Sequence, residues 1–97
     1  MAESKLNKNI SDIKLIDYSL GTVTINAQSD KYLTFDVSNE IPTGYKLLTV
    51  LGHAVGDNGF AWSTFEIINS TTINVGINNI QTISDSGIVR VYLVCVK

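Results

Sequence analysis

The sequence predicts an all-β protein, either a sandwich or a barrel, with about seven short strands and no helix of normal length. Composition gives the first indication. The 97 residues include 12 Ile, 9 Val and 9 Thr, which are branched at Cβ and fit a pleated sheet better than a helix. The second indication is the alternation of apolar and polar residues along most of the chain, a period of two that is typical of half-buried strands. The third is the shortness of the polar turns between the alternating segments.

A chain of this length forms one domain, which we expect at residues 13–97. Residues 1–12 form a polar lead-in that is either frayed or a short helix, because Leu6, Ile10 and Ile13 recur at a near-helical spacing.

Three strands are expected in the amino-terminal half of the domain. Residues 13–18 form the first strand, and residues 18–21 turn the chain. Residues 22–27 and 31–37 both alternate cleanly, and because only three residues separate them, we expect them to pair as a hairpin. Their inward side chains are Val23, Ile25, Ala27, Leu33, Phe35 and Val37.

Four strands follow, at residues 45–55, 60–68, 71–77 and 88–96. The first and last of these are apolar on both faces, so each is either central and covered on both sides or faces a partner chain. Gly52, inside the first of them, marks either a bulge or a close approach of another segment.

The turns between these strands carry their own signals. Residues 38–44 form the longest turn, in which Gly44 permits a positive φ. Residues 56–59 read Gly-Asp-Asn-Gly, and the Asn-Gly pair predicts a tight hairpin between the strands on either side. Residues 78–87 form a polar loop before the last strand.

Charge and hydropathy argue against several kinds of partner. The net charge is −2 and the pI is near 5.1, which favours neither nucleic acid nor an anionic membrane surface. No window approaches the roughly 18 apolar residues of a membrane helix, and no apolar core of a signal peptide follows Met1. Only 16% of residues are charged while 44% are apolar. Such a composition indicates that some surface is buried against a partner.

The residues offer no catalytic, metal or cofactor site. The one histidine, His53, shares a strand face with Leu51 and Val55 and has no carboxylate at a fixed short spacing, so a half-buried histidine bonded to backbone is the simplest interpretation. The single cysteine, Cys95, lies in an apolar run and is expected to be a buried structural thiol. The acidic side chains are not paired in sequence, which favours solvated surface charges at Asp36, Asp57, Glu66 and Asp85.

Aromatic residues are the most informative surface feature. Aromatic rings beside Asn, Asp and hydroxyl groups suit sugar rings, because the C–H face of the sugar stacks and its hydroxyls form hydrogen bonds. Tyr32 points outward from its strand, and Tyr92 shares a face with Arg90. The alternative is that these rings fill the second face of a sandwich or a subunit contact. We predict one ligand-contact cluster, made of Trp62, Phe60, His53, Asp57 and Asn58.

A family resemblance adds to this interpretation. Residues 41–48 (IPTGYKLL) lead into an apolar strand, residues 69–75 (NSTTINV) follow an aromatic strand, and the chain ends on VRVYLVCVK at residues 89–97. This layout, over about residues 20–97, resembles the small C-terminal head or tip domains of tail-fibre and baseplate proteins, the receptor-binding proteins of phages and prophages of Gram-positive bacteria. The resemblance implies a small antiparallel β-sandwich, jelly-roll-like and usually homotrimeric. It would attach to host cell-wall saccharides or to other phage tail or baseplate proteins.

The resulting expectation is a non-enzymatic structural domain of a phage tail or baseplate. It would bind host cell-surface saccharide as a homotrimer, and it would be located in the virion after synthesis in the host cytoplasm. Two alternatives remain open. The first is a virion assembly module without a ligand, and the second is a monomeric bacterial carbohydrate-binding or adhesion domain.

Overall fold

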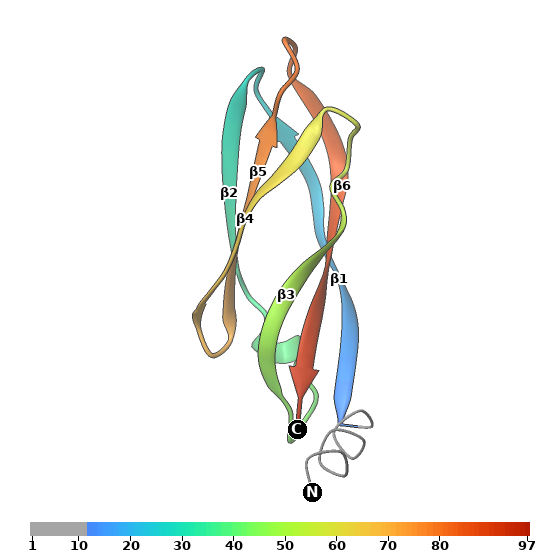
Figure 1. The fold of residues 1–97 in the computed structure, drawn as a ribbon, viewed down its shortest axis with the longest axis vertical. Helices are drawn as coiled ribbons and strands as arrows, with labels where there is room; N and C mark the ends of the chain where they lie inside the picture. The colour runs from blue at the N-terminus through green and yellow to red at the C-terminus, as the bar shows by residue number, and fades with distance from the viewer. Residues whose placement is uncertain (1–11) are drawn as a thin grey trace, which may run out of the picture.

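The protein is a sandwich of two three-stranded antiparallel sheets, as the computed structural model describes it for residues 12–97 (Figure 1). Sheet A has the order β1-β6-β3, with bounds Ile13–Ile25, Asp85–Val96 and Lys46–Ala54. Sheet B has the order β2-β5-β4, with bounds Ser29–Asp36, Thr72–Asn79 and Phe60–Asn69. Within the described residues, the helical content is one turn of 3-10 helix at Ser38–Glu40. The predicted all-β sandwich is confirmed, with six strands instead of about seven. Residues 1–11 of the predicted lead-in lie outside the described part of the chain.

The strands are paired in a nested order that gives a jelly-roll-like winding. β1 pairs with β6 and, inside that pair in the sequence, β2 pairs with β5. Consecutive strands therefore lie in opposite sheets, except β4 and β5. The two predicted hairpins, at residues 22–37 and across residues 56–59, are wrong because each of those turns crosses from one sheet to the other. Alternation shows which side chains point inward, but it does not show to which sheet a strand belongs.

β1 is one long strand where the sequence predicts two strands and a turn. The register of β1 against β6 shifts between Ser19 and Gly21, so Leu20 is the extra residue of a β-bulge. Gly21 has a φ of +83°, and its N–H donates to Ser19 Oγ at 3.1 Å. The turn signal at residues 18–21 is therefore a bulge, which bends β1 without interrupting its pairing.

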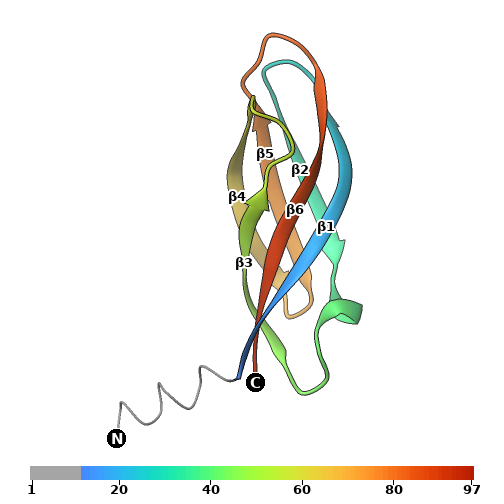
Figure 2. The same cartoon turned by 90° about the vertical axis from the view of Figure 1, so that its right-hand side faces the viewer.

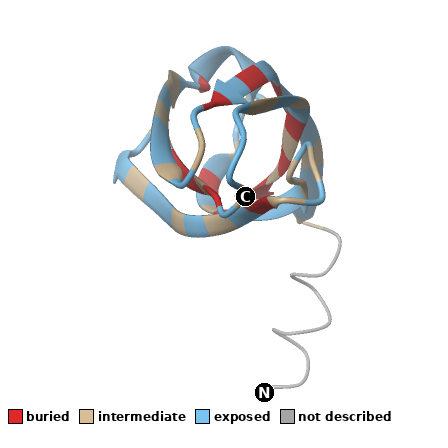
Figure 3. Ribbon diagram, turned by 90° about the horizontal axis from the view of Figure 1, so that it is seen from above, coloured by how far each residue is buried: buried red, intermediate tan, exposed pale blue. Residues whose placement is uncertain are grey.

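The core lies between the sheets and consists mainly of β-branched side chains (Figure 3). The predicted inward positions of the first two alternating segments are confirmed, with Val23, Ile25 and Val37 buried. β5 and β6 contribute fully buried side chains at Ile73, Val75, Ile77, Val89, Val91 and Leu93. Each such side chain stabilises the fold by roughly 1.5–3 kcal/mol relative to exposure. Cys95 is also buried, as predicted, and burial raises the pKa of its thiol.

The two strands with apolar residues on both faces occupy different places in sheet A. β6 is the central strand of sheet A, which is one of the two places that the sequence allows for it, whereas β3 is an edge strand. Gly44 has the expected positive φ, at +84°. In the loop before β4, however, the positive φ belongs to Gly56 and not to the Asn58-Gly59 pair.

The sandwich is elongated, with extents of 54 × 26 × 18 Å. Both ends of the described chain lie at one end of it, where the Lys97 N–H donates to the Asp12 carbonyl at 3.1 Å. The loops at residues 26–28, 55–59 and 80–84 lie at the opposite end (Figures 1 and 2).

Candidate functional site

The structure does not bring the five predicted contact residues together. Phe60 is only 5% exposed and belongs to the core, so its ring offers no face to a ligand. Trp62 also points between the sheets, while His53 lies on the outer face of sheet A. Asp57 and Asn58 lie in the loop at the far end of the sandwich. The two aromatic residues were expected on an outer face, and this expectation is wrong because β4 faces the core at both positions.

Trp62 closes the seam between the two sheets. Its indole lies against Gly52 in β3, so closely that a Cβ built at Gly52 would be 2.5 Å from Trp62 Nε1. The ring centroids of Trp62 and Phe65 are 4.9 Å apart. Both rings point inward because the pairing of β4 shifts by one residue at Ser63. The alternative interpretation of Trp62, that it fills the second face of the sandwich, is the one that the structure bears out.

Asp57 belongs to a hydrogen-bond network between the loops at the loop end, and it does not line an open site. Asp57 Oδ1 accepts from the Gly59 N–H at 2.8 Å and from Gln81 Nε2 at 3.1 Å. Gln81 Nε2 also lies 3.4 Å from Asp85 Oδ2, so one amide joins two carboxylates that the sequence does not pair. The Ser86 N–H lowers the pKa of Asp85, and the hydrogen bond from Gln81 acts in the same direction. These groups fix the loops relative to each other.

Asn79 is the centre of the same network, and sequence reasoning placed it in a polar loop. It is the last residue of β5 and is fully buried. Its Nδ2 donates to the carbonyls of Ile25 at 3.0 Å and Ile83 at 2.9 Å, and its Oδ1 accepts from the Gln81 N–H at 3.0 Å. Asn79 thereby joins the end of β1, the end of β5 and the loop at residues 80–84. No spacing or motif distinguishes it from its neighbour Asn78 in the sequence.

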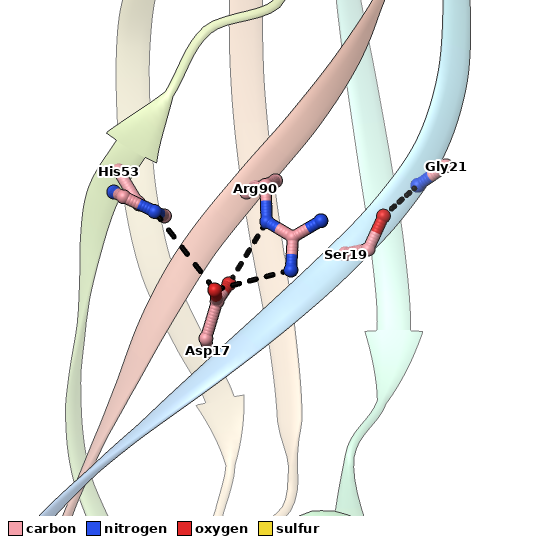
Figure 4. Close-up of polar contacts among 5 residues, drawn as sticks. All are labelled: Asp17, Ser19, Gly21, His53 and Arg90. Atoms are coloured by element: carbon pink, nitrogen blue, oxygen red, sulfur yellow. Dashed lines mark hydrogen bonds and ion pairs between the residues drawn. The ribbon is translucent and has the colours of Figure 1, made fainter.

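The middle of the outer face of sheet A carries a polar cluster drawn from three strands (Figure 4). Arg90 in β6 donates from Nε and Nη2 to the two carboxylate oxygens of Asp17 in β1, each at 3.1 Å. This contact lowers the pKa of Asp17. His53 in β3 stacks on Tyr92 with ring centroids 4.3 Å apart, and its Nε2 is 3.9 Å from Asp17 Oδ2. His53 thus faces outward onto a tyrosine and a carboxylate, instead of being held by backbone as expected.

Large apolar side chains surround this cluster on the same sheet. Five of them are between 45% and 60% exposed, namely Ile13, Leu15, Leu48, Leu51 and Ile88. Register places Leu15 beside Val94 and Leu51 beside Tyr92, so these side chains continue across all three strands. We call this surface, including the polar cluster at its centre, the sheet A face. Extended apolar patches on a domain surface mark interaction sites.

The outer face of sheet B is polar by contrast. Asn74 in its central strand accepts a hydrogen bond from Thr34 Oγ1 at 3.1 Å and lies 3.5 Å from Glu66 Oε1. Asn78 Nδ2 donates to Asp30 Oδ1 at 2.6 Å. One aromatic side chain, Tyr32, lies on this face. We call this surface the sheet B face.

Comparison with protein-family models, with curated proteins and with solved structures found no match for this chain. Within residues 12–97, no three His, Cys, Asp or Glu side chains are grouped so as to hold a metal ion. The same part of the chain contains no helix with the length and apolar character needed to span a membrane.

Proposed function

We propose that this protein is a non-enzymatic structural domain of a phage or prophage tail or baseplate, assembled as a homotrimer and binding host cell-surface saccharide. The observation that carries the assembly is the contrast between the two outer faces. The sheet A face exposes Leu15 and Leu51 among other large apolar side chains, whereas the sheet B face is a hydrogen-bonded polar surface. The virion setting and the three-fold symmetry come from the resemblance of residues 20–97 to phage head domains.

The composition of the sheet A face suits a protein–protein contact. Interfaces are enriched in Tyr and Arg, which are frequent among the residues that contribute most near the centre, and the buried core of an interface is apolar. Here Tyr92 and Arg90 lie at the centre, and leucines and isoleucines surround them. Arg90 already forms a two-point contact with Asp17, so the charge of each is paired within one copy before the face is covered.

The test is the solution mass, measured by light scattering on a sizing column at two concentrations. A stable mass near three times 10.6 kDa is expected. Leu51→Lys places a charge in the apolar face and should convert the trimer to monomer. Ile68→Lys is the matched control, because Ile68 is similarly exposed but lies on β4 at the edge of sheet B, and it should leave the mass unchanged. A wild-type chain that stays monomeric at both concentrations would contradict the assembly.

A monomeric carbohydrate-binding domain is the second candidate, and the sheet B face favours it. That face combines one exposed aromatic ring, on which a sugar can stack, with amide, hydroxyl and carboxylate groups, which can form hydrogen bonds with sugar hydroxyls. This second candidate function predicts sugar binding by a chain that remains monomeric. A ligand-free assembly module, in turn, predicts a trimer that binds no glycan, so mass and glycan binding measured together separate the three functions.

A further inference from the structure

We infer that the sheet B face is the saccharide-contact surface, with the ring of Tyr32 as its stacking platform and a neutral glycan as its ligand. This inference rests on the proposed function for the general class of ligand, but it does not depend on the trimer. It assigns the contact to residues outside the cluster that sequence reasoning predicted.

Tyr32 is held in an unusual position for an exposed tyrosine. It is 59% exposed, and its partner in the register of β2 and β5 is Gly76. A Cβ built at Gly76 would be 2.8 Å from Tyr32 Cε1 and 2.7 Å from Thr64 Cγ2. The tyrosine ring therefore lies over bare backbone in the middle of the sheet, supported on one side and open to solvent on the other. A ring with one supported face and one free face is suited to stack against the C–H face of a sugar.

The polar groups beside the ring are oriented in advance. On one side Asn78 is hydrogen-bonded to Asp30, and on the other Asn74 is joined to Thr34 and Glu66. Each asparagine amide has two N–H donors and a carbonyl oxygen with two lone pairs, so these contacts leave part of its capacity unused. Because the side chains are already ordered by one another, a ligand that binds to them loses less conformational entropy.

Charge distinguishes between classes of glycan. The outward positions of sheet B include the acidic side chains Asp30, Asp36 and Glu66. The one basic side chain in the three strands of sheet B, Lys31, points away from this face and donates from Nζ to the Thr24 carbonyl in β1 at 3.2 Å. An acidic face repels phosphate-bearing polymers and accepts neutral or amino sugars. We therefore commit to a neutral saccharide as the ligand.

The placement of this surface agrees with assembly through the other sheet. The sheet A face and the sheet B face are the two outer surfaces of one sandwich, so contacts made by the first leave the second exposed (Figures 1 and 2). A flat surface with one aromatic ring binds a single sugar chain weakly. Three copies in one assembly would raise the overall affinity through simultaneous contacts.

The experiment compares the wild-type protein with Tyr32→Ala and Tyr32→Phe. The probes are neutral oligomers of glucose, galactose, rhamnose and N-acetylglucosamine, with poly(glycerol phosphate) as the anionic probe. We expect the wild type to bind at least one neutral oligomer and not the anionic polymer. Tyr32→Ala should weaken that binding about tenfold, since loss of a stacking contact costs on the order of one tenfold step in affinity. Tyr32→Phe keeps the ring and should retain most of the binding.

Ile68→Ala is the matched control, because it removes an exposed apolar side chain from sheet B without touching the platform. Circular dichroism of each variant confirms that the fold is retained. Undiminished binding by folded Tyr32→Ala would overturn the inference, and so would binding of the wild type to none of the neutral oligomers or to the anionic polymer instead. Solution mass of the same samples keeps the two proposals apart. A trimer whose sugar binding is undiminished in Tyr32→Ala overturns this inference alone, and a monomer with Tyr32-dependent binding overturns the trimer alone. A trimer that binds none of the glycans overturns both this inference and the saccharide part of the proposed function.

Discussion

At the scale of single residues, the buried amide of Asn79 shows how one side chain orders a whole end of the molecule. Its amide takes the place of water for the Ile25 carbonyl at the end of β1 and for two backbone groups of the loop at residues 80–84. A buried carbonyl or N–H that loses its partner costs about 1–3 kcal/mol. The rigidity of the loop end therefore depends on this residue more than on any apolar contact there.

Asn79→Ala should destabilise the protein by about 2–3 kcal/mol, because it removes the amide donor to the carbonyls of Ile25 and Ile83 and the acceptor of the Gln81 N–H. Urea unfolding followed by circular dichroism measures the change. Asn78→Ala is the control, since Asn78 points outward from the same strand, and its effect should remain near 0.5 kcal/mol. Equal effects of the two substitutions would show that Asn79 is not the centre of the network.

Asp17 gives the protein a defined response to acid. Its hydrogen bonds with Arg90 hold its pKa below the ordinary value of 3.8, so the ionised carboxylate stabilises the folded state above that value. This contribution is lost as the pH falls through the lowered pKa of the folded state. Asp17→Asn should therefore reduce the free energy of unfolding slightly at neutral pH and make it less dependent on pH in the acid range.

Urea unfolding at about pH 7 and about pH 3 tests the response of Asp17. The free energy of unfolding should decrease less between the two pH values in Asp17→Asn than in the wild type. Some decrease should remain in both proteins, because the pKa values of Asp36 and Asp85 are also lowered. An identical decrease in both proteins would show that the contact with Arg90 does not contribute to stability.

The residues of the predicted site illustrate what spacing reveals and what it does not. The sequence correctly placed Tyr92 and Arg90 on one face and Tyr32 on another outward face, because alternation within a strand is local. It did not predict the contact between His53 and Tyr92, since that contact depends on which strands are neighbours in the sheet. The inward position of Trp62 follows from the side of β4 that faces the core, which no local pattern indicates.

At the scale of elements, the bulges explain most differences between expectation and structure. The bulge at Leu20 joins two predicted strands into β1, and the shift at Ser63 turns Phe65 to the same side as Trp62. A bulge inserts one residue and so reverses the assignment of every later side chain in the strand. β5 has no bulge of its own, and its alternation continues without interruption, so that Ile73, Val75 and Ile77 all point into the core.

The seam between β3 and β4 allows a direct test. Gly52→Ala places a methyl group within 2.6 Å of Trp62 Nε1 and Cε2, and it should destabilise the protein by about 1–3 kcal/mol. The double variant with Trp62→Leu removes the obstructing ring, so the two substitutions together should cost less than the sum of their separate effects. Thermal unfolding of the four proteins gives this comparison. Strictly additive effects would mean that the indole does not occupy the space above Gly52.

At the scale of the whole molecule, a polar face and an apolar face lie on opposite sides of a single thin sandwich. Because the described residues form two sheets, every outward side chain of sheet A is separated from every outward side chain of sheet B by the core. A substitution on the sheet B face should therefore leave assembly intact, and a substitution on the sheet A face should leave the binding of sugar to each single copy intact. Assembly measured with Leu51→Lys and sugar binding measured with Tyr32→Ala are accordingly independent observations.

The hydrogen bond between Lys97 and Asp12 has a mechanical consequence. The two ends of the described chain belong to neighbouring antiparallel strands and lie at the same end of their ladder, which runs from Ile13 beside Val96 to Ile25 beside Asp85. A force that pulled these two ends apart would break the hydrogen-bonded pairs of β1 and β6 one after another, starting from this end, and would meet little resistance. Tension between these two ends is therefore the load that the β1–β6 pairing resists least.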